Sequence, residues 1–160
     1  MMVGDLMTRK VRTCRDTDTL ADVAQRIYEG DCGCVPVVSS DGSSRVIGMI
    51  TDRDICMATH FRRKRPSEIS IADAMTRTVH TIGPFESIAN AETLMRDAQV
   101  RRLPVVDREQ RLVGLVSLAD LARGAHRPSQ KSPSADFEVG RTLSAITRAR
   151  QPKLLTAYAS

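Results

Sequence analysis

Two segments of the chain carry apolar residues at the spacing of a helix that is buried along one face. The apolar side chains recur every three or four positions, at Leu20, Val23, Ala24 and Ile27, and again at Ile88, Ala91, Leu94 and Met95. This period predicts two amphipathic helices. Polar residues precede both segments, so the candidate N-caps are Asp18 or Thr19 for the first helix and Glu86 or Ser87 for the second.

Short runs rich in β-branched residues surround each predicted helix. An extended piece comes before it, over residues 11–14 and 79–82. Two strand-like runs joined by a polar turn come after it, at 34–39 with 46–51 and at 102–107 with 112–117. A further short helix opens at Asp52 or Leu118. The order is β-α-β-β-α, twice, which predicts an α+β fold.

The two halves also match residue for residue, which indicates an internal repeat. Matched residues lie 68 positions apart before the polar turn and 66 apart after it, because the first turn is longer. The matches are Met7-Thr8 with Met75-Thr76, Pro36–Val38 with Pro104–Val106, Gly48 with Gly114, Thr51 with Ser117, and Asp54 with Asp120. A unit of about 50 residues buries little core alone, so the two copies are expected to pack together sheet to sheet.

The repeats leave two other segments. We predict a first repeat over 1–60, a second over 73–124, and a basic linker over 61–72. The linker's positive run is expected to be a solvated loop, with an anion-binding patch as the alternative. The tail 125–160 begins rich in Ser and Pro, which is typical of loop or disorder. Near 137–150 it carries Val139, Leu143 and Ile146 at helical spacing, which predicts one amphipathic helix docked on this chain or on a second subunit.

Composition narrows the classes of function. The chain has 160 residues, 41% of them hydrophobic and 27% charged, and has neither an apolar run for a membrane span nor a secretory signal. We therefore expect a cytoplasmic protein without a membrane partner. The net charge of +5 favours anionic partners, either phosphorylated small molecules or nucleic acid. Aromatic residues are only 3%, which argues against stacking on single-stranded nucleic acid.

Cysteine and histidine do not form a recognisable metal motif. The four cysteines, Cys14, Cys32, Cys34 and Cys56, are expected to be reduced and to act mainly as small apolar residues. Their spacing matches no zinc finger, and we expect no metal. A redox-sensitive or metal-binding role for Cys32 and Cys34 stays open as the alternative. No catalytic residues are predicted, since the chain has no nucleophile–base pair, HExxH or P-loop.

The repeated Thr/Ser-x-x-Asp pattern lies where a strand gives way to a helix. A hydroxyl followed by a carboxylate three residues on resembles a capping box at a helix N-terminus. The same carboxylate can accept hydrogen bonds from both hydroxyls of a ribose. Capping and binding can coexist in the same residues.

With these motifs the chain resembles a tandem pair of CBS domains, or Bateman module, in a stand-alone CBS-domain protein. The resemblance rests on the two Met-Thr starts and on the paired strand-Gly-strand-Thr/Ser-x-x-Asp stretches, over roughly three quarters of the chain. It implies two β-α-β-β-α repeats packed about a pseudo-two-fold axis, with two clefts between them. Such clefts commonly hold AMP, ADP, ATP, S-adenosylmethionine or NAD, and two pairs usually join as a homodimer.

The resemblance also implies which residues bind the ligand. Asp54 and Asp120 would hold ribose, and the hydroxyls of Thr51 and Ser117 would donate to phosphate. The remaining positions would wall the adenine or reach the phosphates. Around Asp120 they are Lys10, Val11, Cys32, Cys34 and Arg101, and around Asp54 they are Arg53, Arg77, Val79, Val100 and Arg102.

The predicted function is that of a regulatory sensor and not of an enzyme. An adenine nucleotide would bind in the clefts and change the conformation read by a protein effector. The alternative is a dimerisation or nucleic-acid-binding regulatory protein that does not sense nucleotides.

Overall fold

The structure is a computed structural model that describes residues 1–125, 142, 143, 145 and 146. Within that part the chain forms two compact units, each with its own small sheet, helices and hydrophobic core. One unit holds Val11–Val79, and the other combines Met1–Lys10 with the described residues from His80 to Ile146. We call them the first and the second unit. The predicted α+β class is confirmed.

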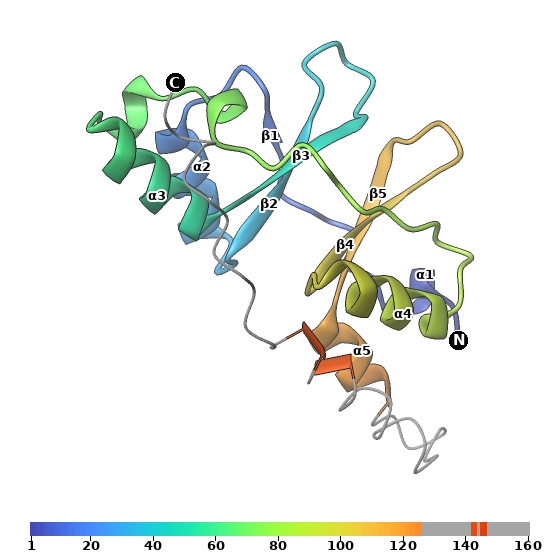
Figure 1. Cartoon of the computed structure of the whole chain (residues 1–160). Helices are drawn as coiled ribbons and strands as arrows, with labels where there is room; N and C mark the ends of the chain where they lie inside the picture. Colours follow the sequence, from blue (N-terminus) through green and yellow to red (C-terminus); the bar gives the residue numbers. More distant parts are fainter. Residues whose placement is uncertain (126–141, 144, 147–160) are drawn as a thin grey trace. The chain divides into compact units, whose positions relative to one another are not determined.

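The first unit is built on a three-stranded sheet in the order β1-β2-β3 (Figure 1). Strand β1 is parallel to β2, and β2 and β3 form an antiparallel hairpin. Helix α2 joins β1 to β2, and helix α3 follows β3 directly. The elements are β1 (Cys14–Arg15), α2 (Leu20–Glu29), β2 (Cys34–Val38), β3 (Val46–Thr51), α3 (Asp52–Arg62) and the 3₁₀ helices η1 (Pro66–Glu68) and η2 (Ile71–Asp73).

The second unit repeats this plan with a smaller sheet. It contains α1 (Val3–Leu6), α4 (Ile88–Ala98), β4 (Arg102–Val106), β5 (Leu112–Ser117) and α5 (Leu118–Ala125). Its sheet is the antiparallel pair β4-β5. Where the first unit has β1, only Ile82 joins the sheet, with its N–H donating to Pro104 O at 3.0 Å and its carbonyl accepting from Val106 N at 2.9 Å. The extended piece expected at 79–82 thus contributes a single residue.

Side-chain caps fix the starts of the two long helices. Of the alternatives left by the sequence, the structure selects Thr19 for α2 and Ser87 for α4. The Thr19 side chain accepts a hydrogen bond from Asp22 N, and the Ser87 hydroxyl accepts one from Asn90 N. Each cap satisfies a backbone donor that the helix itself leaves unpaired.

The opening segment of each repeat belongs to the unit built mainly by the other repeat. Thr8 pairs with Leu115 of β5, and Thr76 pairs with Met49 of β3. Both bridges are reciprocal, with N···O distances of 2.9 and 3.0 Å at Thr8 and 2.9 Å twice at Thr76. The matched Met-Thr pairs in the sequence therefore mark strand-like segments that extend the sheets at β5 and β3.

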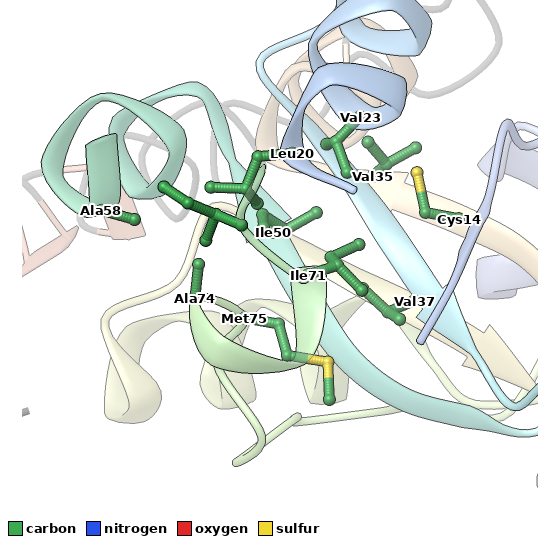
Figure 2. Packing of buried hydrophobic residues seen from close by; sticks show 11 residues of the cluster. Cys14, Leu20, Val23, Val35, Val37, Ile50, Ala58, Ile71, Ala74 and Met75 are labelled. Atoms are coloured by element: carbon green, nitrogen blue, oxygen red, sulfur yellow. The ribbon is translucent and has the colours of Figure 1, made fainter. Parts of the chain in front are cut away.

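The core of the first unit gathers residues from widely separated parts of its chain. Figure 2 shows Leu20 and Val23 of α2 near Val35 of β2, with Ile71, Ala74 and Met75 in the same cluster. Its remaining members are Cys14, Val37, Ile50, Ala58 and Ile69. This one core thus contains residues that precede the predicted linker 61–72, residues within it and residues that follow it.

The segment 61–72 has two distinct parts. Helix α3 continues to Arg62, and the cations Arg63, Lys64 and Arg65 that follow are exposed. Ile69 and Ile71 are then buried in the first core, with exposed fractions of 2% and 0%. The exposed cations agree with the expected solvated loop, whereas the apolar half of the segment is structural.

A methionine packs over a glycine in each unit. A Cβ placed on Gly48 would lie 2.5 Å from Met75 Sδ, and one on Gly114 would lie 2.5 Å from Met7 Sδ. The backbone is also close, since the Gly114 Cβ would be 3.1 Å from Thr8 O. The glycines matched in the sequence are therefore needed because the opening segment lies directly against the strand.

We expect Gly114→Ala to destabilise the second unit by about 1–3 kcal/mol, since overpacking displaces Met7 and presses on the Thr8 carbonyl. Urea unfolding measures the change. Gly83→Ala in the same unit is the control, because its Cβ would have only Glu86 Cγ nearby, at 3.7 Å. Equal stability of the two variants would contradict the close approach of Met7.

Of the tail 125–160, the structure describes Ala125 at the end of α5 and four later residues. Thr142, Leu143, Ala145 and Ile146 are helical, and Ile146 is buried in the core of the second unit. The side chain of Leu143 is exposed. The helix expected near 137–150 stays a prediction, because Val139 and most of its other residues lie outside the described residues.

Candidate functional site

The two Thr/Ser-x-x-Asp motifs form the same hydrogen-bonded arrangement, and we call them the hydroxyl–carboxylate pairs. The Thr51 hydroxyl donates to Asp54 Oδ2 at 2.7 Å, and the Thr51 N–H donates to the same oxygen at 2.9 Å. In return, Asp54 N donates to Thr51 Oγ1 at 3.2 Å. For Ser117 with Asp120 the corresponding distances are 2.6, 2.8 and 3.2 Å. The capping interpretation of the sequence is confirmed in both repeats.

Capping leaves one oxygen of each carboxylate for other partners. Oδ2 accepts two hydrogen bonds within the box, which fills its two lone pairs. Oδ1 of Asp120 accepts a hydrogen bond from Arg123, while no donor from the described residues bonds to Oδ1 of Asp54. A ligand hydroxyl would therefore meet the Oδ1 atoms first.

Each pair is bordered by the start of the preceding strand. Cys34 lies opposite Thr51 across β2 and β3, and Arg102 lies opposite Ser117 across β4 and β5. The first N–H of α3 donates to Gly33 O at 3.2 Å, and that of α5 donates to Arg101 O at 2.9 Å. The structure thus brings Cys34 to the Thr51–Asp54 pair, and Arg101 and Arg102 to the Ser117–Asp120 pair.

The opening segment of each repeat, which belongs to the unit built mainly by the other repeat, adds further predicted residues to each unit. Lys10 lies in the same unit as Asp120, while Arg77 and Val79 lie in the same unit as Asp54. The Arg77 guanidinium donates to Ala72 O at 3.1 Å, which ties it back to its own segment.

The other predicted groupings join residues of different units. Val11, Cys32 and Cys34 were expected around Asp120, and Val100 and Arg102 around Asp54. These groupings stay predictions. Arg53 is an exposed residue one position before Asp54, as the sequence suggests.

Two further arginines contribute to these regions although the sequence patterns did not predict them. Arg9 matches Arg77 at the repeat offset and makes the same kind of bond, donating to Gly4 O at 3.1 Å. Arg123 lies three residues after Asp120 and forms an ion pair with it. The repeat offset was the available signal for Arg9, and the helical i,i+3 spacing was the signal for Arg123.

The cysteines differ strongly in their surroundings. Burial raises the pKa of the Cys14 thiol, although Arg26 lowers it by donating to Sγ at 3.5 Å. Cys34 is buried, Cys32 is partly buried and Cys56 is exposed. Within the described part of the chain, no three His, Cys, Asp or Glu side chains are grouped to hold a metal ion. None of the helices described there has the length and apolar character needed to cross a bilayer.

A family comparison matches both halves of the chain. The CBS-domain model matches residues 3–60 and 71–127. The chain belongs to the CBS-domain family. Each match covers one of the repeats, and in the described structure each repeat ends in one hydroxyl–carboxylate pair and the helix that follows it.

Two relatives match over most of their own length, and one of them is named for its CBS domains. The CBS domain-containing protein YhcV of Bacillus subtilis is 35% identical over 120 residues, which are 75% of this chain and 82% of that protein. Hypoxic response protein 1 of Mycobacterium tuberculosis is 34% identical over 119 residues, covering 74% of this chain and 81% of its own length.

Solved structures share the fold. The crystal structure of Hypoxic Response Protein I with two coordinated zinc ions has a TM-score of 0.70 at 32% identity, covering 80% of this chain and 100% of that one. The CBS domain pair of protein MJ0100, in complex with 5′-methylthioadenosine and S-adenosyl-L-methionine, has a TM-score of 0.69 at 25% identity and covers 79% and 98% of the two chains.

Other relatives extend beyond the matched region. The match spans 60% of an uncharacterised Methanopyrus kandleri protein and only 23% of a homoserine O-acetyltransferase from Methanohalobium evestigatum. CBS-domain proteins are generally regulatory. Because the match covers so small a share of the acetyltransferase, it gives no reason to assign acetyl transfer to this chain.

Proposed function

We propose that this protein is a regulatory module that binds an adenosine-containing ligand, with Asp54 and Asp120 as ribose acceptors. The observation that carries the proposal is the arrangement of the hydroxyl–carboxylate pairs. In each pair the helix cap fixes one oxygen, so the carboxylate is held rigidly before any ligand arrives. A preorganised acceptor loses little conformational entropy on binding.

The chemistry of the ligand follows from the geometry of these carboxylates. A ribose presents two neighbouring hydroxyl donors, and Oδ1 of Asp54 has two lone pairs to receive them. At Asp120 one lone pair of Oδ1 accepts from Arg123, so a ribose there would compete with Arg123 or share Oδ1 with it. Charge-assisted hydrogen bonds of this kind are stronger than neutral ones. The adenosyl ligands of the MJ0100 domain pair support an adenosine-containing ligand here as well.

The proposed output is regulation of a protein partner by a homodimer of the module in the cytoplasm. Ligand binding shifts the balance between two conformations of the protein, and the partner binds one of them more tightly. The size of the effect is limited by the ligand's differential affinity for the two conformations.

The proposal is tested by calorimetric titration with AMP, ADP, ATP, S-adenosylmethionine and NAD. Asp54→Asn and Asp120→Asn keep the side-chain volume and a cap acceptor but remove the charge. We expect at least one variant to weaken binding by about tenfold or more, since a hydrogen bond to a charged group contributes roughly 1.5–3 kcal/mol.

Asp22→Asn is the matched control. Asp22 forms the same box with Thr19 at the start of α2. Its Oδ2 accepts from the Thr19 hydroxyl at 2.7 Å and from the Thr19 N–H at 2.8 Å, and Asp22 N donates to Thr19 Oγ1 at 3.4 Å. If the aspartates only cap helices, all three variants lose similar stability and none changes binding. That result, or no binding of any of the ligands to the folded protein, would refute the proposed function.

A further inference from the structure

The two hydroxyl–carboxylate pairs differ in what lies one helical turn beyond the aspartate. Arg123 donates to Asp120 Oδ1, whereas Met57 holds the equivalent position after Asp54 and its thioether cannot donate. The Asp120 side chain is only 12% exposed, while that of Arg123 is 71% exposed. The carboxylate is thus fixed, and its cationic partner lies at the surface.

The residues that border the two pairs also place more positive charge at the Ser117–Asp120 pair. Gly33 and Arg101 are equivalent, because their carbonyls accept the first N–H of α3 and of α5. Cys34 and Arg102 are equivalent, because they lie opposite Thr51 and Ser117. Arg101 and Arg102 are both exposed, and no carboxylate of the described residues pairs with either.

At one position the positive charge lies instead at the Thr51–Asp54 pair. Arg53 precedes Asp54, and Ala119 precedes Asp120. The Ser117–Asp120 pair therefore has three arginines at positions where the Thr51–Asp54 pair has Gly33, Cys34 and Met57. The Thr51–Asp54 pair has one arginine, Arg53, at a position where the other pair has Ala119. This asymmetry of charge lies at equivalent positions of a duplicated site.

We propose that Arg123 makes the Ser117–Asp120 pair select its ligand by charge, whereas the Thr51–Asp54 pair does not. The Ser117–Asp120 pair prefers a nucleoside di- or triphosphate, and the Thr51–Asp54 pair binds nucleoside ligands with or without phosphates equally well. The inference rests on the proposed function and adds the class of ligand at each pair.

The reason is a competition for Arg123. An uncharged nucleoside that takes both lone pairs of Asp120 Oδ1 displaces Arg123 and leaves the guanidinium with water alone. A phosphorylated nucleoside supplies a new anion for Arg123, as its ribose takes the oxygen that Arg123 gives up. Guanidinium–phosphate contacts are strong, bidentate and directional. At Asp54 no such displacement is needed.

The test compares ATP with adenosine by calorimetry in chains that keep one pair each. In Asp54→Asn, which keeps Asp120, we expect ATP to bind about tenfold or more tighter than adenosine. In Asp120→Asn, which keeps Asp54, we expect a ratio near one. Adding Arg123→Met to the first chain should weaken ATP and strengthen adenosine, and should lower the ratio by about tenfold.

The duplication supplies the reciprocal and control variants. Adding Met57→Arg to the Asp120→Asn chain should raise its ratio of ATP to adenosine affinity. Arg108→Met removes one positive charge from the same unit, at the turn between β4 and β5 and so at the far end of the hairpin from Ser117, and should leave the ratio unchanged. Higher salt should reduce the ATP preference.

The outcomes separate the two proposals. If both ligands bind and Arg123→Met leaves the ratio unchanged, or changes it no more than Arg108→Met, selection by Arg123 is wrong while ribose binding stands. If neither ligand binds to any of the folded chains, both proposals fail. Circular dichroism of each variant establishes that it is folded.

Discussion

Removal of Met1–Lys10 is expected to lower the unfolding free energy of the second unit by about 3–6 kcal/mol, from the lost burial of Val3 and Met7 alone. Both side chains lie in that unit's core, with exposed fractions of 0% and 9%. The loss is comparable with the whole stability of a small domain, roughly 5–15 kcal/mol. The second unit should therefore unfold first, although nearly all of its chain is intact.

Hydrogen exchange followed strand by strand checks this expectation. Amide protection should fall in β4 and β5 and persist in β2 and β3. The double variant Val3→Ala/Met7→Ala should reproduce most of the loss, whereas Met2→Ala, whose side chain is half exposed, should not. Equal loss of protection in both sheets would contradict the assignment of the segment to the second unit.

Ile71→Ala is expected to destabilise the first unit by about 2–5 kcal/mol, the usual cost of removing a large buried aliphatic side chain. Ile71 is fully buried, although it lies in the segment that separates the repeats. Denaturant unfolding at constant m-value measures the change. Ile71→Val is the control and should cost only about 0.5–1.5 kcal/mol. A negligible effect of both variants would mean that the segment is a plain linker.

Local patterns predicted the elements of this fold well. The helical spacing of Leu20 and Val23 identifies the face of α2 that is buried, and the residues before the helices narrow the caps to two candidates each. The Thr/Ser-x-x-Asp pattern predicts the capping boxes. These features depend on residues a few positions apart, so they can be read from a short window of sequence.

Features that depend on distant parts of the chain could not be predicted. The pairing of Thr8 with Leu115 depends on a main-chain bridge, which leaves no mark in the hydrophobic pattern. Met7 and Gly114 stood out as repeated residues, but their contact is visible only in the structure. Likewise, the ion pair of Arg123 with Asp120 needed the helix to be placed first.

The exchanged opening segments have a consequence for the order of folding. Val11–Val79 is continuous in the chain, so the first unit has all of its residues as soon as that stretch has been synthesised. The second unit must bring Thr8 to Leu115, about 100 residues later, and closing so long a loop is entropically costly. Folding of the first unit shortens this loop, because it holds the ends of its own 69 residues at a fixed separation. Folding of the first unit should therefore lower the entropic cost of closing the loop in the second unit, and so speed its folding.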